Sequence, residues 1–333
     1  MRYLYGPIPS SRLGQSLGVD PVPLKTCNWN CVYCQLGRST PMVHERREYV
    51  PRAAVIAELK EALAGGIGPV DWVSFVGSGE PTLHVGLGWM IRAAKAETTL
   101  PIAVITNGSL LYLPEVREEL CAADLVMPTL AAADEQVYRR IHRPHPEATF
   151  ARQVDGLAAF RKLYRGQFWI EVMLIRGLND DAATLDGLAR LLRALAPDQV
   201  HLTLPNRPPA EPWVMPPDDE GLMRAVSILG QWAHVVHPAG GAFALPPGTP
   251  LVDGIIDIIA RHPMSDGQVR ALVAQDAPGE VEAVLARLAA DVRAQVIERH
   301  GTCFWIKAGS VFGGNGHRPN VAVQEPVTQN TAI

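Results

Sequence analysis

The sequence predicts an α/β protein: a partial (βα)6 barrel of the TIM-like kind, followed by a small C-terminal winged-helix-like domain. Short apolar, β-rich runs alternate with helical patterns from residue 70 onward, as in βα units. With an early strand at residues 19–24 the chain offers about six such units, fewer than the eight of a closed barrel. From residue 250 the pattern changes in kind. We therefore expect an open barrel and a separate small domain.

The predicted strands are short runs rich in β-branched and aromatic residues, at 19–24, 72–76, 102–105, 125–127, 168–174 and 200–204. The predicted helices between them carry apolar residues at helical spacing, at 53–64, 85–96, 115–121, 135–142, 150–164 and 182–195. This order predicts a parallel sheet built from βα units.

The domain boundary is predicted where chain-breaking residues gather. Residues 238–249 are rich in Pro and Gly, which indicates a linker between a core domain at 1–237 and a second domain at 250–308. Three helices and a hairpin are expected in the second domain, at 251–261, 265–274, 278–289 and around Gly301. Residues 309–333 lack apolar periodicity and are predicted to be a flexible tail.

Composition and charge narrow the function classes. Hydrophobic residues make up 47% of the 333 residues, enough for a sizeable core, and no apolar run is long enough to predict a membrane span. The net charge is −4, and residues 250–308 carry six Lys or Arg against eight Asp or Glu. We therefore expect no DNA partner, because DNA binding depends on cationic contacts to phosphates. The other two thiols, Cys121 and Cys303, are far apart in the sequence, and no apolar leader segment is recognised. We therefore expect a protein of the reducing cytoplasm.

Three cysteines within eight residues are the main chemical signal. Cys27, Cys31 and Cys34 lie on one short segment, far from Cys121 and Cys303. Three thiolates on one loop can hold an iron-sulfur cluster and leave one iron open to a further ligand. A zinc knuckle that uses His44 as fourth ligand and three coincidental thiols are the alternatives. Structural zinc usually takes four ligands, often in two close pairs, and there is no second pair here.

A glycine-rich turn follows the strand at 72–76. It contains Gly77, Ser78, Gly79 and Glu80. Small residues let the backbone approach a ligand closely, and a carboxylate can pair with an ammonium group. By itself the turn is equally compatible with a plain strand-to-helix connection.

Polar residues also end later strands, where barrels usually hold ligands. They lie at Thr106, Asn107 and Gly108, at Pro128 and Thr129, at Glu171, and at residues 206–209. Glu171 and His201 are equally compatible with interior residues whose partners lie within the protein. Residues 142–145 lie at the end of a predicted helix. They could form a solvated helix end or a loop that contacts the substrate.

The Cys-x3-Cys-x2-Cys loop, with Tyr33 before its last cysteine, resembles the cluster loop of the radical S-adenosylmethionine (radical SAM) superfamily. Residues 5–10, 12–14, 16–20 and 23–26 are similar to a subgroup of wyosine-synthase-like members, and the resemblance extends to about residue 237. It implies a [4Fe-4S] cluster on Cys27, Cys31 and Cys34. It also implies an S-adenosylmethionine site whose contacts are Tyr33, Gly77, Ser78, Gly79, Glu80, Thr106, Asn107 and Thr129.

The resemblance implies an enzyme that cleaves S-adenosylmethionine to a 5′-deoxyadenosyl radical, which removes hydrogen from an unidentified substrate. An electron donor such as flavodoxin or ferredoxin is implied as partner. Relatives in the wider grouping rebuild a guanosine in transfer RNA, but wyosine synthases carry a second cluster for which Cys121 and Cys303 are too few. RNA modification and modification of a protein or peptide therefore stay open.

Two further observations bear on the alternatives. The compact basic spots that could serve an RNA partner are Arg46–Arg47, Arg139–Arg140 and His142–Arg143. An alternative outside the enzymes is a non-catalytic iron-sulfur or zinc regulator. Glu80 argues against a regulator, because a sensor needs no carboxylate for an amine.

Overall fold

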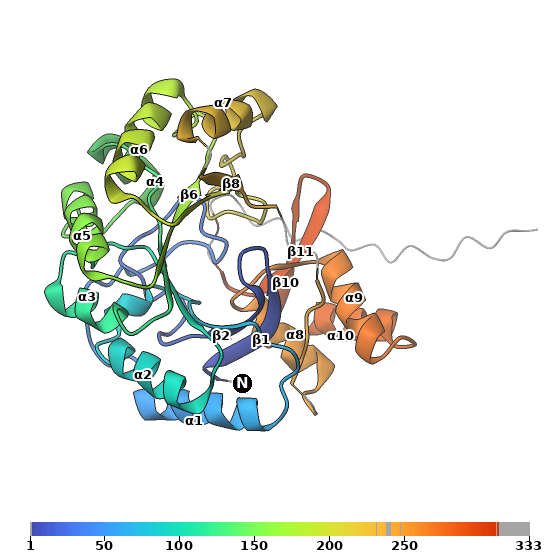
Figure 1. Ribbon diagram of the computed structural model, residues 1–333. Coiled ribbons are helices and arrows are strands. Elements are labelled where there is room, and N and C mark those ends of the chain that lie inside the picture. The colour runs from blue at the N-terminus through green and yellow to red at the C-terminus, as the bar shows by residue number, and fades with distance from the viewer. Residues whose placement is uncertain (1, 231, 238–240, 247, 311, 313–333) are drawn as a thin grey trace, which may run out of the picture.

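The computed structural model describes residues 2–230, 232–237, 241–246, 248–310 and 312. Its main sheet has eight strands in chain order: β1 Leu4–Ser10, β2 Gly14–Val19, β3 Trp72–Phe75, β4 Ile102–Thr106, β5 Leu125–Pro128, β6 Gln167–Met173, β7 Gln199–Thr203 and β8 Ala233–Val235. Strands β2 to β8 are parallel, and β1 is antiparallel to β2. Within the described residues β1 and β8 do not pair, so the barrel is open (Figure 1). The predicted partial barrel is confirmed.

Helices cover the outer face of this sheet (Figure 1). They are α1 Arg52–Ala64, α2 Leu87–Glu97, α3 Pro114–Leu120, α4 Glu135–His142, α5 Phe150–Leu163, α6 Ala182–Leu195 and α7 Asp219–Leu229, with a short 3-10 turn at Pro81–Leu83. Six strands, β2 to β7, are each followed by one or two of these helices. The sequence analysis located the helices after β2 to β6 but did not identify α7, which follows β7. The main core lies between sheet and helices, and side chains such as Leu59, Phe75, Met90 and Phe160 are fully buried in it.

Side-chain caps fix where several helices begin. Asp134, Thr149 and Asp181 precede α4, α5 and α6, and each accepts a hydrogen bond from the backbone N–H three residues later. Such caps satisfy donors that the first helical turn leaves free. The helices predicted at 135–142 and 182–195 have these same bounds in the structure.

In the main sheet, the sequence analysis misplaced one strand and missed two. The strand expected at 19–24 lies at Gly14–Val19, because Pro21 and Pro23 lack the N–H donors that a central strand needs. Strand β1 was missed because Gly6, Pro7 and Pro9 obscure its alternation, and the edge of a sheet tolerates proline. Strand β8 has only three residues and gives little pattern.

The C-terminal unit contains the three predicted helices and the predicted hairpin. Its elements are α8 Leu251–Ile259, β9 Met264–Ser265, α9 Asp266–Asp276, α10 Val281–Ala290, β10 Ala294–Arg299 and β11 Thr302–Lys307. The two-residue β9, which the sequence analysis did not identify, adds a third antiparallel strand to the hairpin. Ser265 and Gln268 form a capping box at the start of α9.

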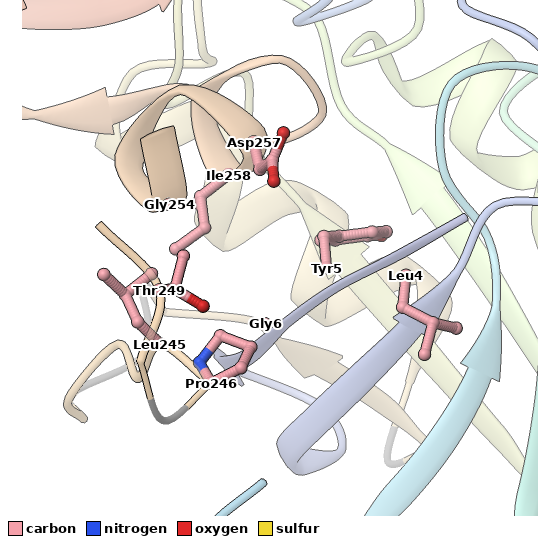
Figure 2. A pocket seen from close by; sticks show the side chains of 9 residues that line it. All are labelled: Leu4, Tyr5, Gly6, Leu245, Pro246, Thr249, Gly254, Asp257 and Ile258. Atoms are coloured by element: carbon pink, nitrogen blue, oxygen red, sulfur yellow. The ribbon is translucent and has the colours of Figure 1, made fainter. Parts of the chain in front are cut away.

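This unit packs beside β1, at one edge of the open barrel (Figure 1). Tyr5 and Ile8 of β1 share a buried apolar cluster with Ile255 and Ile258 of α8. A small pocket remains between β1 and α8, with Tyr5 and Ile258 in its lining (Figure 2). From the hairpin, Arg299 donates hydrogen bonds to the carbonyl groups of Pro205 and Val214, after β7. The unit therefore reaches from β1 to the far side of the barrel opening.

Part of the predicted linker and most of the predicted tail, namely residues 238–240, 247, 311 and 313–333, lie outside the described residues. The boundaries 1–237, 238–249, 250–308 and 309–333 thus stay predictions. None of the helices described is long and apolar enough to cross a membrane.

Substitution of Ile258 by alanine tests the junction between α8 and β1. Ile258 is 1% exposed and already borders the pocket, so we expect a loss of about 2–5 kcal/mol in unfolding free energy, measured by urea denaturation. Val292→Ala is the control, because Val292 is 90% exposed and its truncation should cost no more than about 0.5 kcal/mol. Equal effects of both substitutions would show that the junction contributes no stability.

Candidate functional site

The segments singled out in the sequence meet at the carboxyl edge of the sheet. The cysteine loop follows β2, the glycine turn follows β3, and Asn107 and Thr129 follow β4 and β5. Thr129 pairs with Glu171 of β6, which pairs with His201 of β7. These side chains therefore stand at one level across neighbouring strands, where parallel sheets usually bind ligands.

The three thiols of the cysteine loop form a group that suits a cationic ligand. Burial, and after it the neighbouring charges, raise the pKa of Cys27 to about 12; the pKa of Cys31 is raised well above its usual range by burial and then by Cys27 and Cys34. Lys25 donates a hydrogen bond from Nζ to Cys34 Sγ at 3.1 Å. Buried thiolates that repel one another need a positive partner, which iron supplies.

The geometry of the described residues does not match a zinc site. Among them, no three His, Cys, Asp or Glu side chains are grouped so that they could bind one metal ion. His44 lies 3.3 Å from the Asn28 amide and 3.4 Å from the Tyr112 hydroxyl, and its ring stacks on His145. A four-iron cluster is larger than a single ion, so its thiolate ligands can stand farther apart.

The end of α4 holds the cysteine loop in place. Asn30 N donates to the carbonyl of His142 at 2.9 Å, and the His142 ring stacks on Trp29 with centroids 3.9 Å apart. His142 is fully buried with Nδ1 3.4 Å from Cys31 Sγ, and burial lowers its pKa to about 3. The interpretation of His142 as part of a solvated helix end was therefore wrong. The signal that could have found it is Trp29, a large apolar residue inside the cysteine loop.

The glycine turn packs directly against the cysteine loop. A Cβ on Gly79 would lie 1.9 Å from the carbonyl oxygen of Thr26, and Gly77 has a φ of +138° beside Asp20. Glu80 N donates to the Thr26 carbonyl at 2.9 Å, and Lys25 N donates to the Ser78 carbonyl. Glycine is required here because two backbones approach more closely than any side chain allows.

Glu80 joins this turn to the end of β4. It is 1% exposed; its Oε1 accepts hydrogen bonds from Thr82 and from Thr106 Oγ1, and its Oε2 accepts one from Asn107 N at 2.7 Å. Burial raises the pKa of Glu80, and these donors oppose the rise. Oε2 keeps acceptor capacity for one further donor.

Asn107, Thr129 and Tyr33 also border the site. Asn107 Nδ2 donates to Asn28 in the cysteine loop at 2.8 Å. Gln153 of α5, 1% exposed, donates from Nε2 to the carbonyls of both Asn107 and Thr129 and so fixes the ends of β4 and β5. The sequence analysis missed Gln153, because one polar residue in an amphipathic helix gives no signal. The Tyr33 ring makes an edge contact with His142.

The inner faces of β6 and β7 carry the second polar group of the site. Glu171 forms an ion pair with Arg12, which follows β1. His201 Nε2 lies 2.8 Å from Gln199 Oε1, and burial lowers the His201 pKa to about 4, with the Arg12 charge adding to the shift. Both Glu171 and His201 thus have interior partners.

The C-terminal unit reaches the glycine turn through two charged residues. Ser78 donates from N and Oγ to Asp20, and Arg261, just after α8, donates from Nε to Asp20 Oδ2 at 2.9 Å. The Arg261 carbonyl accepts a hydrogen bond from Gln35, beside Cys34. Arg261 and Asp20 lie 241 residues apart, so no local pattern could have paired them.

Comparison with known proteins gives a family match and several relatives. The model for the Radical SAM superfamily matches residues 22–192. A UPF0026 protein of Methanocaldococcus jannaschii is 34% identical over 233 residues, 69% of this chain and 72% of that protein. A protein of Brachyspira hyodysenteriae named GTPase Obg is 41% identical over 204 residues, 61% of this chain but only 30% of its own length. A structure of TYW1 with a lysine-pyruvate adduct bound has a TM-score of 0.45 and 16% identity, covering 88% of this chain and 80% of that one.

Substitution of Gly79 by alanine tests the contact between turn and loop. The added methyl group would overlap the Thr26 carbonyl, so we expect a loss of about 3 kcal/mol in unfolding free energy and less iron retained after anaerobic reconstitution. Gly267→Ala is the matched control, because nothing lies near a Cβ there and alanine favours α9 by up to about 1 kcal/mol. Normal stability and iron content in Gly79→Ala would contradict this contact.

Substitution of Asp20 by asparagine tests the link to the C-terminal unit. The side chains of Arg261 and Asp20 are 13% and 4% exposed, so removal of one charge should cost about 3–5 kcal/mol in unfolding free energy. The double variant Asp20→Asn, Arg261→Met should recover much of this loss, as measured by urea denaturation in a double-mutant cycle. Strictly additive effects would mean that the two charges are not coupled.

Proposed function

This chain belongs to the radical SAM superfamily of enzymes, which use a [4Fe-4S] cluster and S-adenosylmethionine, and on that premise we propose how its residues hold both cofactors and what they do. When bound, the two cofactors supply a 5′-deoxyadenosyl radical that removes a hydrogen atom from a substrate. The protein binds and orients these groups and keeps water from them. The observation that carries the proposal is the packing of the cysteine loop against the glycine turn.

Cys27, Cys31 and Cys34 are the proposed cluster ligands. The donor set suits iron, since three thiols share one loop and one of them already accepts a hydrogen bond from the Lys25 ammonium. His142 and Trp29 would hold the loop in shape, because their stacked rings pack beneath it.

Glu80 is the proposed partner of the cofactor's amino group, through the spare acceptor capacity of Oε2. The backbone of Gly77, Ser78 and Gly79 would border the same group. Ser78 Oγ already donates to Asp20, so its side chain positions the turn.

The remaining proposed contacts divide into two kinds. Thr106 Oγ1 donates to Glu80 and accepts from Gly108 N, so Thr106 orients the carboxylate. Asn107, Thr129 and Tyr33 would contact the cofactor itself; Asn107 follows β4, Thr129 follows β5 and Tyr33 belongs to the cysteine loop.

Radical SAM enzymes need a reductant, and we propose flavodoxin or ferredoxin as the donor in a cytoplasmic setting. The C-terminal unit is proposed to cap the site, because the Arg261 guanidinium contacts Asp20 and the Arg261 carbonyl accepts a hydrogen bond from the Gln35 side chain, beside Cys34. The proposed division at residues 238–249 would make this cap a separate domain.

Two substrate classes remain candidates, RNA and a protein or peptide. Of the basic residues that would serve RNA, Arg46 pairs with Glu119 and Arg143 pairs with Glu211. Glu119 balances Arg46, whereas Glu211 is shared by Arg143 and Arg38 and leaves one positive charge over, so both substrate classes stay proposals.

Anaerobic reconstitution with iron and sulfide, followed by dithionite and S-adenosylmethionine, tests the proposal. We expect 5′-deoxyadenosine from the wild type and none from the variant with alanine at Cys27, Cys31 and Cys34. Glu80→Gln should keep its iron but bind S-adenosylmethionine at least tenfold more weakly, since an ion pair with the ammonium is lost.

Glu61→Gln is the matched control for Glu80→Gln, because Glu61 is exposed on α1 and distant in the chain from the loop. It should equal the wild type in iron content and cofactor affinity. A fully loaded wild type that neither binds S-adenosylmethionine nor forms 5′-deoxyadenosine would refute the proposed function.

A further inference from the structure

Arg207 lies where three parts of the molecule meet at the carboxyl edge of the sheet. It follows β7, and its guanidinium donates from Nη1 to Gln35 Oε1 at 3.1 Å and from Nη2 to His262 Nε2 at 2.7 Å. Gln35 directly follows Cys34, and His262 belongs to the C-terminal unit. The guanidinium is thus held between the cysteine loop, the β7 segment and the proposed cap.

Both acceptors of Arg207 are neutral. A guanidinium has no acceptor, so His262 Nε2 accepts the hydrogen bond and the ring is uncharged in this contact. Within the described residues no Asp or Glu carboxylate lies within ion-pair distance of Arg207. By comparison, the arginines Arg12, Arg46 and Arg261 each form an ion pair with a carboxylate.

The surroundings of Arg207 disfavour its positive charge. Burial lowers the pKa of Arg207 to about 10, and the charge of Arg12 contributes to the same shift. A cation removed from water without an opposite charge is unfavourable, so the site is complete only with an anion.

Two side-chain donors without a partner are buried inside the barrel. Phe168, Ile170 and Val172 of β6 pack in the outer core, so Trp169 and Glu171 face the interior. Trp169 is 7% exposed and its ring lies 4.9 Å from that of His201, yet its Nε1 has no hydrogen-bond partner; Arg12 Nε is also buried without one. An indole and a guanidinium only donate, so a ligand rich in acceptor oxygens would satisfy them.

The proposed cluster thiolates and the cofactor's amino group have other proposed partners. Lys25 already donates to Cys34 Sγ, and Glu80 and Asn107 follow β3 and β4. None of these residues supplies an anion to Arg207.

We propose that the inner faces of β6 and β7 and the segment after β7 bind an anionic group of the substrate, a carboxylate or a phosphate, with Arg207 as the contacting cation. The proposal rests on the proposed function, because it assigns the bound anion to the substrate. A planar guanidinium suits either anion, since both accept two parallel hydrogen bonds.

Calorimetric titration of the anaerobically reconstituted protein tests the proposal, with inorganic phosphate and acetate as separate probes and S-adenosylmethionine present. We expect the wild type to bind at least one probe, and Arg207→Gln to bind it at least tenfold more weakly. Arg207→Lys should retain part of the affinity for phosphate, because lysine keeps the positive charge but lacks the planar pair of N–H donors of a guanidinium. A preference for phosphate would indicate a nucleotide or nucleic acid, and a preference for acetate a peptide or organic acid.

Arg287→Gln is the matched control, since Arg287 is exposed on α10 and pairs with Glu280. It should bind both probes like the wild type. Iron content and far-ultraviolet circular dichroism check that each variant is folded, and Arg207→Lys provides a second, milder change if Arg207→Gln is not.

Two outcomes would overturn the proposal. One is equal anion binding by the wild type and both Arg207 variants. The other is unchanged anion binding with weaker S-adenosylmethionine binding in Arg207→Gln, which would assign the residue to the cofactor. Formation of 5′-deoxyadenosine is recorded separately, so failure of the proposed function is distinguished from failure of anion binding.

Discussion

The close approach of Gly79 to the Thr26 carbonyl is the contact on which the rest of the site depends. It brings the loop after β2 and the turn after β3 into one rigid body, joined by the hydrogen bond from Glu80 N. Because Glu80 in turn binds Thr106 and Asn107, the same body extends to the end of β4. Proposed metal ligands and proposed cofactor contacts are thereby fixed relative to one another, as catalysis by positioning requires.

Charge is distributed unevenly around this body. Asp20 and Glu80, which are acidic, stand beside the glycine turn, and their donors come from Ser78, Arg261, Thr106 and Asn107. Arg12 has one carboxylate and Arg207 has none among the described residues. A buried cation without a carboxylate favours the proposed substrate with negative charge.

The C-terminal unit is part of this arrangement through few but buried contacts. Its apolar surface packs on Tyr5 and Ile8, while Arg261 and His262 reach the site itself. A change in the position of α8 would therefore act on Asp20 and Arg207 together. The unit can thus influence both the proposed cofactor contacts and the proposed anion site without supplying a reacting group.

The sequence by itself determined the strand-helix alternation, the cysteine loop, the glycine turn and the three helices of the C-terminal unit, because spacing and turn chemistry are local properties. It misplaced the first strand and gave no sign of Gln153 or the buried His142, and it named residues 206–209 without showing that Arg207 has no carboxylate partner. Only the tertiary structure decided these, because burial and charge balance depend on residues distant in the chain. Arg261 shows the reason: its partner Asp20 is 241 residues away, and only the folded chain brings the two within 2.9 Å.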